Sequence, residues 1–412
     1  MSLLNKRTAA AVFFAFAFAY FFSALVRAIT ATLAPTLTQE FSLQSRDLGL
    51  LAGGYFLGFA ALQLPLGTWL DRYGPRKVIL SFLSVAVLGC AAFAVANSFW
   101  GLLAARVLCG AGVSACLMAP LTGYRRWLSP ANQLRANSWM LMSGSLGMLA
   151  STLPVQWLQP VVGWRFLFWG LAVLIMLAMG VLAWLVPPWA ASTPNAQAGR
   201  KEQSGYREVW RNPYFRRMVP LAFFNYGGLV AIQTLWAGPW LVKVSGYTAL
   251  QAATGLFWIN LCMLFTFWGW GLVTPALVRA GWHANRLMLW GVPSSLMALA
   301  IICIAGSAAS TWAWAVFCVG CSFIALSQPA VAMAFPPALA GRALSAYNLA
   351  IFSGVFVVQW GIGLLIDGFG AAGLSTVASF QAAMAVFLAC SVAAYAWFVW
   401  AKTDNEMPTP ST

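Results

Sequence analysis

Acidic residues and histidine are scarce in this chain. Its 412 residues include 8 Asp and Glu and a single His, against 23 Lys and Arg. Catalytic sites usually need a nucleophile beside an acid or base, and hard metal ions need several carboxylate oxygens. The sequence shows neither pattern, nor the glycine-rich loop of a P-loop nucleotide site. We therefore expect no enzyme, no cofactor and no metal site.

The acidic residues and the histidine also avoid the apolar segments. His283 lies in a predicted loop, and every acidic residue lies at or beyond the end of an apolar run. These residues are Glu40, Asp47, Asp71, Glu202, Glu208, Asp367, Asp404 and Glu406. A buried acid that could carry a proton through a membrane is thus missing.

The eight cysteines give no disulfide framework, because all lie inside apolar runs, where a thiol packs as a small hydrophobic group. Cys318 and Cys321 have CxxC spacing. Without histidine or acidic ligands nearby, packing is favoured over metal or redox chemistry.

Hydrophobic side chains are abundant. They make up 61% of the chain, and the mean hydropathy is +0.79. Runs of about 20 apolar residues, long enough to cross a bilayer as a helix, recur throughout, and barrel-like alternation is absent. We predict an all-α membrane protein with twelve transmembrane helices. The expected spans are 9–37, 46–69, 78–97, 99–122, 133–156, 164–186, 218–243, 249–273, 285–306, 312–335, 340–366 and 376–401.

The net charge of +15 does not indicate a nucleic-acid partner, because the basic residues stand at alternate helix ends. This is the positive-inside pattern. It predicts a multi-pass protein of a bacterial-type inner membrane with both termini in the cytoplasm. The first apolar segment continues beyond the core of a signal peptide, so we expect it to be a helix of the protein.

A polar stretch divides the chain into six plus six spans. We predict an N-terminal bundle over 1–186, a cytoplasmic linker over 187–217 with a short helix near 206–211, and a C-terminal bundle over 218–412. Matches at a constant offset of 207 positions support two parallel repeats. The matched pairs are Pro130 and Pro337, Arg135 and Arg342, Ala136 and Ala343, Ser138 and Ser345, and Gly147 and Gly354. Such repeats leave a central cavity between the bundles.

The loop after the second span carries the most specific motif. Its sequence fits G-x-x-x-D-R-x-G-x-R-K, formed by Gly67, Asp71, Arg72, Gly74, Arg76 and Lys77. Here the chain resembles the major facilitator superfamily, which implies two pseudo-symmetric six-helix bundles. The resemblance also implies that Asp71 lies near the start of the eleventh helix. A carboxylate is favoured at a helix N-terminus, so this contact can latch the cytoplasmic gate. A solvated charged turn that only fixes topology is the alternative.

Arg106, Gly110 and Gly112 resemble the family's R-x-x-x-G-x-G motif of the fourth helix. A role in transport and a helix-bridging or snorkelling role are both open for Arg106. The fifth helix lacks the Gly-Pro core of the family's drug/proton antiporter signature, which argues against a multidrug exporter.

Arg27 lies inside the first span, where a guanidinium is costly unless it faces a protein interior or a cavity. Leu25-Val26-Arg27 and Leu33-Ala34-Pro35 are similar to the first helix of the organophosphate:anion exchange branch, which implies that Arg27 binds an anionic group. That branch has a second cation in the seventh helix, and this chain has no central cation there, because Lys243 lies at the outer end of the helix. A carboxylate or a larger mixed-polarity anion is therefore favoured over a phosphate.

Helical spacing places Tyr20, Ser23 and Thr30 on the face of Arg27. Tyr226 and Gln233, seven residues apart in the seventh helix, are candidates for the opposite wall. Further candidates are Asn260, Gln328, Asn348 and Phe352. For each amide, an interhelical hydrogen bond is an equally good interpretation.

We expect alternating-access transport of a small organic anion by a monomer in the bilayer. Anion exchange, uniport and cotransport with a solute-borne proton remain open as mechanisms. Export of amphipathic compounds and a transporter-like solute sensor are the alternatives.

Overall fold

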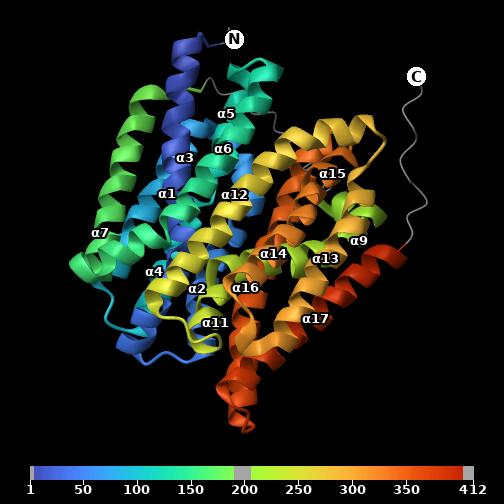
Figure 1. Ribbon diagram of the computed structural model, residues 1–412. Coiled ribbons are helices and arrows are strands. Elements are labelled where there is room, and N and C mark those ends of the chain that lie inside the picture. Colours follow the sequence, from blue (N-terminus) through green and yellow to red (C-terminus); the bar gives the residue numbers. More distant parts are fainter. Residues whose placement is uncertain (1–3, 190–205, 402–412) are drawn as a thin grey trace.

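The computed structural model describes residues 4–189 and 206–401, and within these ranges the chain is helical, with no β-strand (Figure 1). The first half comprises α1 (Lys6–Phe41), α2 (Ser45–Ala61), α3 (Gln63–Val95), α4 (Phe99–Val113), α5 (Ala115–Trp127), α6 (Pro130–Ala150) and α7 (Leu153–Leu185). Residues 206–211 form the short helix predicted near the end of the linker.

The second half begins with one crossing built from five segments and continues with longer helices. Its elements are α9 (Pro213–Leu221), η1 (Ala222–Tyr226), α10 (Gly227–Ala231), η2 (Ile232–Trp236), α11 (Ala237–Lys243), α12 (Ala249–Arg279), α13 (Ala284–Ala305), η3 (Gly306–Ala308), α14 (Thr311–Cys321), η4 (Ser322–Leu326), α15 (Ser327–Met333), α16 (Pro337–Ala371) and α17 (Thr376–Trp400). η1 and η2 are π-helical turns, and η3 and η4 are 3₁₀ turns.

Two glycines each form a sharp kink inside a helix of the structure, so that one helix contributes to two membrane crossings. Ten stretches of the described residues are long and apolar enough to cross a membrane. Within α3 and α7, however, Gly74 has φ 79° and ψ 163° and Gly163 has φ 76° and ψ 156°. Residues with a side chain rarely adopt this conformation. Each helix is therefore split between two crossings, and with α2 and α6 the chain makes the twelve crossings predicted.

Prolines break two of the predicted spans. The second crossing consists of α2 and the start of α3, which meet at Leu62, and the fifth consists of α6 and the start of α7. Proline has no N–H for the carbonyl four residues earlier, and its ring clashes with that carbonyl. Pro65 thus leaves Ala61 as the last residue of α2, and Pro154 does the same for Ala150 in α6.

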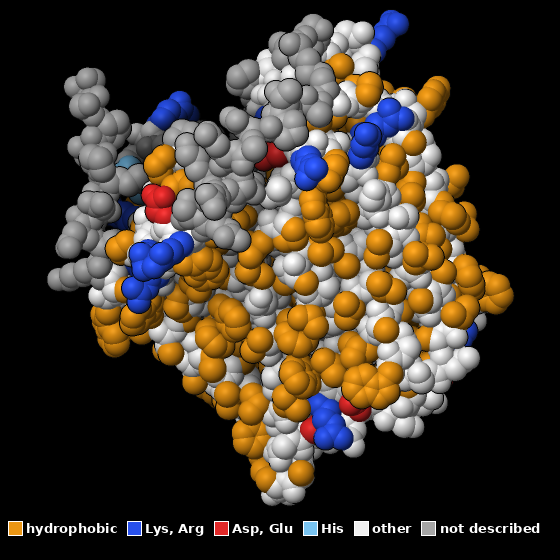
Figure 2. Space-filling view, turned by 180° about the vertical axis from the view of Figure 1, so that it is seen from behind, with side chains coloured by type: hydrophobic (Ala, Val, Ile, Leu, Met, Phe, Trp, Pro, Cys, Tyr) orange, Lys and Arg blue, Asp and Glu red, His pale blue; other side chains and the backbone are white. Residues whose placement is uncertain are grey.

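The surface divides into a hydrophobic middle and two polar ends. Figure 2 shows hydrophobic side chains over the middle of the face, Lys and Arg mostly towards one end, and a smaller charged group at the other. We call the first the linker end, where Arg126 stacks over Trp189 at 4.0 Å from the ring centroid. At the opposite end Arg165 pairs with Glu40 at 2.6 Å. This is the surface expected of a protein that spans a bilayer.

The division of the chain at 186 and 217 remains a prediction, since residues 190–205 of the linker lie outside the described ranges. The helices of the two halves meet along α2 and α16, which lie side by side in the centre of the molecule.

Gly110 offers a test of the packing between α2 and α4. A Cβ atom on Gly110 would overlap the carbonyl oxygen of Tyr55. We expect Gly110→Ala to destabilise the protein by about 1–3 kcal/mol, the usual cost of overpacking. Thermal unfolding of the purified protein in detergent measures this effect.

The control is Gly180→Ala, at a position of α7 where a Cβ would meet no atom within 4 Å. Alanine is the better helix former, so this variant should be unchanged or slightly more stable. Equal melting temperatures for both variants would contradict the close approach of α2 and α4.

Candidate functional site

Arg27 lies in α1, and one of its polar atoms is enclosed without a partner. The side chain is half-buried, and within the described residues its Nε atom has no hydrogen-bond acceptor. The guanidinium interacts electrostatically with Tyr20, two turns earlier on α1, and with Tyr55 of α2. Arg27 is therefore held among phenol groups and not against a carboxylate.

Arg106 of α4 is a second enclosed guanidinium, with 0% exposure. Its Nη1 atom donates a hydrogen bond of 2.8 Å to the carbonyl oxygen of Val26, the residue before Arg27. Its Nε and Nη2 atoms are enclosed and have no partner in the described part of the chain. Arg106 thus bridges α4 to α1, as one of the two sequence interpretations has it, and does not snorkel.

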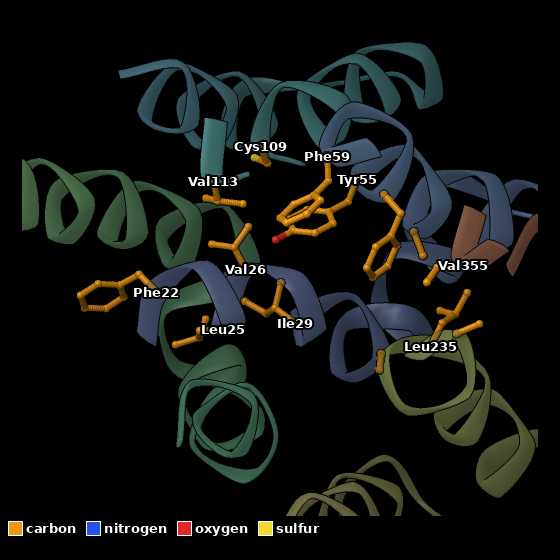
Figure 3. Packing of buried hydrophobic residues seen from close by; sticks show 14 of the residues in the cluster. Phe22, Leu25, Val26, Ile29, Tyr55, Phe59, Cys109, Val113, Leu235 and Val355 are labelled. Carbon is orange, nitrogen blue, oxygen red and sulfur yellow. The ribbon is translucent and has the colours of Figure 1, made fainter. Parts of the chain in front are cut away.

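Tyr55 connects the two arginines. The guanidinium carbon of Arg106 lies 5.0 Å from the centre of the Tyr55 ring, a cation–π distance. The Tyr55 hydroxyl donates to the carbonyl oxygen of Ser23 at 3.3 Å. Figure 3 shows the Tyr55 side chain pointing from α2 towards α1 near Val26. The sequence reasoning missed this residue, although Gly54 and Gly58 beside it indicate a close helix contact.

Arg27 and Arg106 form a positively charged region with no acidic residue beside them in the described part of the chain. In residues 4–189 and 206–401 the acidic residues are Glu40, Asp47, Asp71, Glu208 and Asp367, at or near helix ends. Taking a cation out of water without pairing it costs several kcal/mol. A group kept at that cost inside a membrane is a candidate for ligand binding, because an anion would offset it.

Tyr226 places the seventh crossing opposite Arg27. It ends the π turn η1, and it interacts electrostatically with both Tyr20 and Arg27. Gln233 lies in the second π turn, η2. Pro239, in the following helix α11, has no N–H to donate to the carbonyl of Leu235 in η2. The missing bond favours an irregular turn at this place. π turns of this kind often occur at functional sites.

The predicted amides are joined in two pairs. Gln233 donates to Asn260 at 2.9 Å, and Asn260 in turn donates to the carbonyl of Leu256 at 2.9 Å. Gln328 donates to Asn348 at 2.8 Å. The Gln233–Asn260 and Gln328–Asn348 contacts are interhelical hydrogen bonds of the kind that the sequence left as the alternative to ligand binding, whereas the bond of Asn260 to Leu256 lies within α12.

Other predicted site residues pack between helices. Phe352 lies 4.3 Å from Phe59 and 6.2 Å from Phe56, measured between ring centres, so it joins α16 to α2. Ser23 and Thr30 are buried at 1% and 2% exposure, and the Ser23 hydroxyl has no partner among the described residues. Of the predicted site residues, Tyr20 and Tyr226 interact electrostatically with Arg27, and Ser23 lies one turn before it on α1.

The motif loop packs against the end of α7 and the residues after it at the linker end of the first half. A Cβ on Gly74 would overlap the ring of Trp189, so this position also excludes a side chain sterically. Arg76 donates to the carbonyl oxygen of Ala183 in α7, and Arg72 stacks over Tyr73 at 5.2 Å.

The remaining motif residues face the surface or the second half. Asp71 and Lys77 are exposed. A Cβ on Gly67 would lie 4.0 Å from the Ser345 hydroxyl, which brings this end of the second crossing next to α16. The contact of Asp71 with the start of α16 stays a prediction.

Comparison with known families decides the classification. The sequence model described as Major Facilitator Superfamily matches residues 16–359. The chain belongs to the major facilitator superfamily. Members of this superfamily are transport proteins, not enzymes, and the superfamily fold of twelve helices in two six-helix bundles is confirmed. The chain is a multi-pass protein of the inner membrane.

Several transport proteins are similar in sequence to this superfamily protein. It is 26% identical over 384 residues to the inner membrane transport protein YajR of Escherichia coli, covering 89% of this chain and 76% of the relative. It is 24% identical to the probable sulfoacetate transporter SauU of Cupriavidus necator, covering 57% of each chain. It is also 24% identical to the niacin transporter NiaP of Acinetobacter baylyi, covering 65% of each. The latter two matches thus span less than two thirds of those relatives.

Solved structures show the same fold. A D-xylose-proton symporter superimposes with a TM-score of 0.76 at 13% identity, covering 97% of this chain and 99% of the other. A bacterial homologue of the lysosomal transporter Spinster gives 0.74 at 18% identity, covering 97% and 98%.

The enclosed charge of Arg106 predicts an unusual stability effect. We expect Arg106→Met to unfold at the same temperature as the parent protein or a higher one, because removing a buried unpaired cation offsets the lost bond to Val26. Thermal unfolding without added solute measures this.

Gly110→Ala, one turn along α4, is the destabilised reference for that comparison. A loss of stability as large as that of Gly110→Ala would show that Arg106 supports the fold and is not retained for a ligand.

Proposed function

We propose that this protein moves a small organic anion across the inner membrane by alternating access, with Arg27 and Arg106 binding the acidic group. The observation that carries the proposal is a pair of guanidinium groups that each have an enclosed, unpaired N–H and, within residues 4–189 and 206–401, no carboxylate partner. A bound carboxylate would supply acceptors for Nε of Arg27 and for Nε and Nη2 of Arg106.

The second positive charge comes from an unexpected helix. The seventh crossing offers Tyr226 and Gln233 but has cations only near its ends, whereas α4 supplies Arg106, which binds the carbonyl of the residue before Arg27. Both charges therefore belong to the first half, and the second half contributes phenol and amide groups. A solute whose acidic group meets the arginines and whose polar body meets Tyr226 fits this arrangement.

The names of the relatives support the class of solute. Sulfoacetate and niacin, named for two of them, are small organic acids. A carboxylate or sulfonate group matches the planar fork of a guanidinium. Sulfoacetate and niacin differ in shape, so the relatives support a class of solute and not one particular solute.

The transport cycle that we propose needs no buried acid. The solute would bind between the halves, which rock about it. Anion exchange, uniport and entry of a protonated solute are the three modes compatible with a site of two arginines. The linker end carries most Lys and Arg on the face drawn in Figure 2, so we place it, with both termini, in the cytoplasm.

Substitution of Arg27 tests the site. A thermal-shift screen of the purified protein against organic acids first identifies a solute, because a ligand of the native state raises its stability. We expect Arg27→Ala to slow uptake of that solute into proteoliposomes by about ten- to a hundredfold, the range for losing a charge-assisted hydrogen bond. Arg27→Lys should restore only part of the rate, because lysine lacks the planar fork.

Lys6→Ala is the control, since it removes an exposed cation at the start of α1. Parental uptake by both Arg27 variants would refute the proposal. Resistance to amphipathic compounds in cells that express these variants would then favour the exporter alternative.

Asp71 is the second test, because we propose that it latches the cytoplasmic gate. We expect Asp71→Asn to lower the maximal exchange rate by about two- to fivefold. This factor corresponds to the free energy with which a helix N-terminus stabilises a carboxylate. The half-saturating solute concentration should stay constant. Glu208→Gln, which removes another exposed acid at the linker end, should leave the rate unchanged. An Asp71 variant with the rate of the Glu208 variant would speak for a merely solvated turn.

A further inference from the structure

A carboxylate links the two halves at the end of the molecule opposite the linker. Asp367, near the end of α16, accepts hydrogen bonds from the backbone N–H groups of Ser45 at 3.1 Å and Arg46 at 2.8 Å. These residues form the first turn of α2, in the other half of the chain. The bond therefore crosses the boundary that must open when a central site becomes accessible from this side.

The bond is stronger than an ordinary surface contact. The first N–H groups of a helix have no partner within the helix, and the positive end of its dipole attracts a carboxylate. Hydrogen bonds to an ionised acceptor are about twice as strong as neutral ones. Asp367 thus stabilises the closed arrangement of α2 and α16 through two such bonds at once.

Helix α2 does not need Asp367 for its own cap. Asp47, in the same first turn, accepts from the backbone N–H of Gln44 at 3.0 Å and completes a capping box within α2. The cap local to the helix is thereby present without any residue of α16. The contact of Asp367 is additional to it and is the one that joins the halves.

The helices are fixed at van der Waals contact beside this bond. A Cβ on Gly49 of α2 would overlap the carbonyl oxygen of Gln359 in α16, and a Cβ on Gly363 of α16 would overlap that of Ser45. Figure 1 shows α2 and α16 side by side in the centre of the molecule. Because the backbones meet here, Asp367 is held against the first turn of α2.

Water can reach the bond from the surface. A hollow of about 740 Å³ lies next to it and is lined by Arg46, Lys243, Asp367, Leu374 and Thr376, among others. If the halves separate, water in this hollow can replace both bonds of Asp367 without leaving a buried unpaired group. The contact is therefore reversible, as a gate requires.

The arrangement mirrors the proposed cytoplasmic gate. There, Asp71 at the end of the second crossing is expected at the start of α16; here, Asp367 at the end of α16 binds the start of the second crossing. We propose that Asp367 is a latch that holds the outer gate closed, reciprocal to Asp71 on the cytoplasmic side. The inference rests on the proposed alternating access and orientation.

The distance between the halves tests the latch directly. Spin labels at Gln39→Cys, near the end of α1, and Ala372→Cys, after α16, report on outer separation, and both positions are exposed. Pulsed EPR on the purified full chain without solute gives the distance distribution. Samples without the two added cysteines correct for labelling of the native thiols.

We expect Asp367→Asn to raise the ratio of wide to narrow outer separations by about tenfold, the effect of losing one strong hydrogen bond to a charged group. Asp367→Glu keeps the charge and should return the ratio most of the way to the parental value. Asp47→Asn removes the same charge from the same turn without touching α16, and it should leave the ratio unchanged.

Each outcome is decisive. A parental distribution for Asp367→Asn, or equal widening for the Asp367 and Asp47 variants, overturns the latch. If Asp367→Asn does not elute as a folded protein, Asp367→Glu and Asp367→Ser are compared in its place. Because no solute is present, failure of the latch is distinguishable from failure of anion binding by Arg27.

Discussion

Arg106 of α4 donates a hydrogen bond to the carbonyl of Val26 in α1. This bond holds the guanidinium of Arg106 against the turn of α1 that contains Arg27. Tyr55 interacts with both guanidinium groups, and among the described residues no carboxylate pairs with either of them. An ionisable side chain inside a membrane usually faces the protein interior and binds a backbone carbonyl or another charged group. Arg106 does so through the carbonyl of Val26, and α2, which carries Tyr55, is packed closely against both α4 and α16.

The helices around the proposed site contribute different groups to it. α1 and α4 carry the two arginines and α2 carries Tyr55, whereas the seventh crossing faces them with irregular turns and uncharged polar groups. In the site that we propose, one half binds the acidic group and the other half binds the remainder of the solute. Rocking of the halves then changes access without separating Arg27 from Arg106.

The sequence predicted the twelve crossings well, because length and hydropathy alone limit what can span a bilayer. Pro65 and Pro154 carried enough information to place two breaks that were missed, since proline acts on the carbonyl four residues earlier. Arg27 followed from the cost of its charge. The direction of Arg106, the role of Tyr55 and the pairing of Gln233 with Asn260 could not be predicted, because each depends on which helix lies opposite. An aromatic residue in an apolar run has no pattern that separates it from core.

The two π turns of the seventh crossing determine which of its side chains face the first half. A π turn accommodates one residue more than an α turn, and an α-helix advances by about 100° per residue. Each extra residue therefore turns the side chains that follow it by about 100° relative to a continuous α-helix, first before Gly227–Ala231 and again before α11. The face that this crossing presents to Arg27 thus depends on both irregular turns and not on the helical spacing alone.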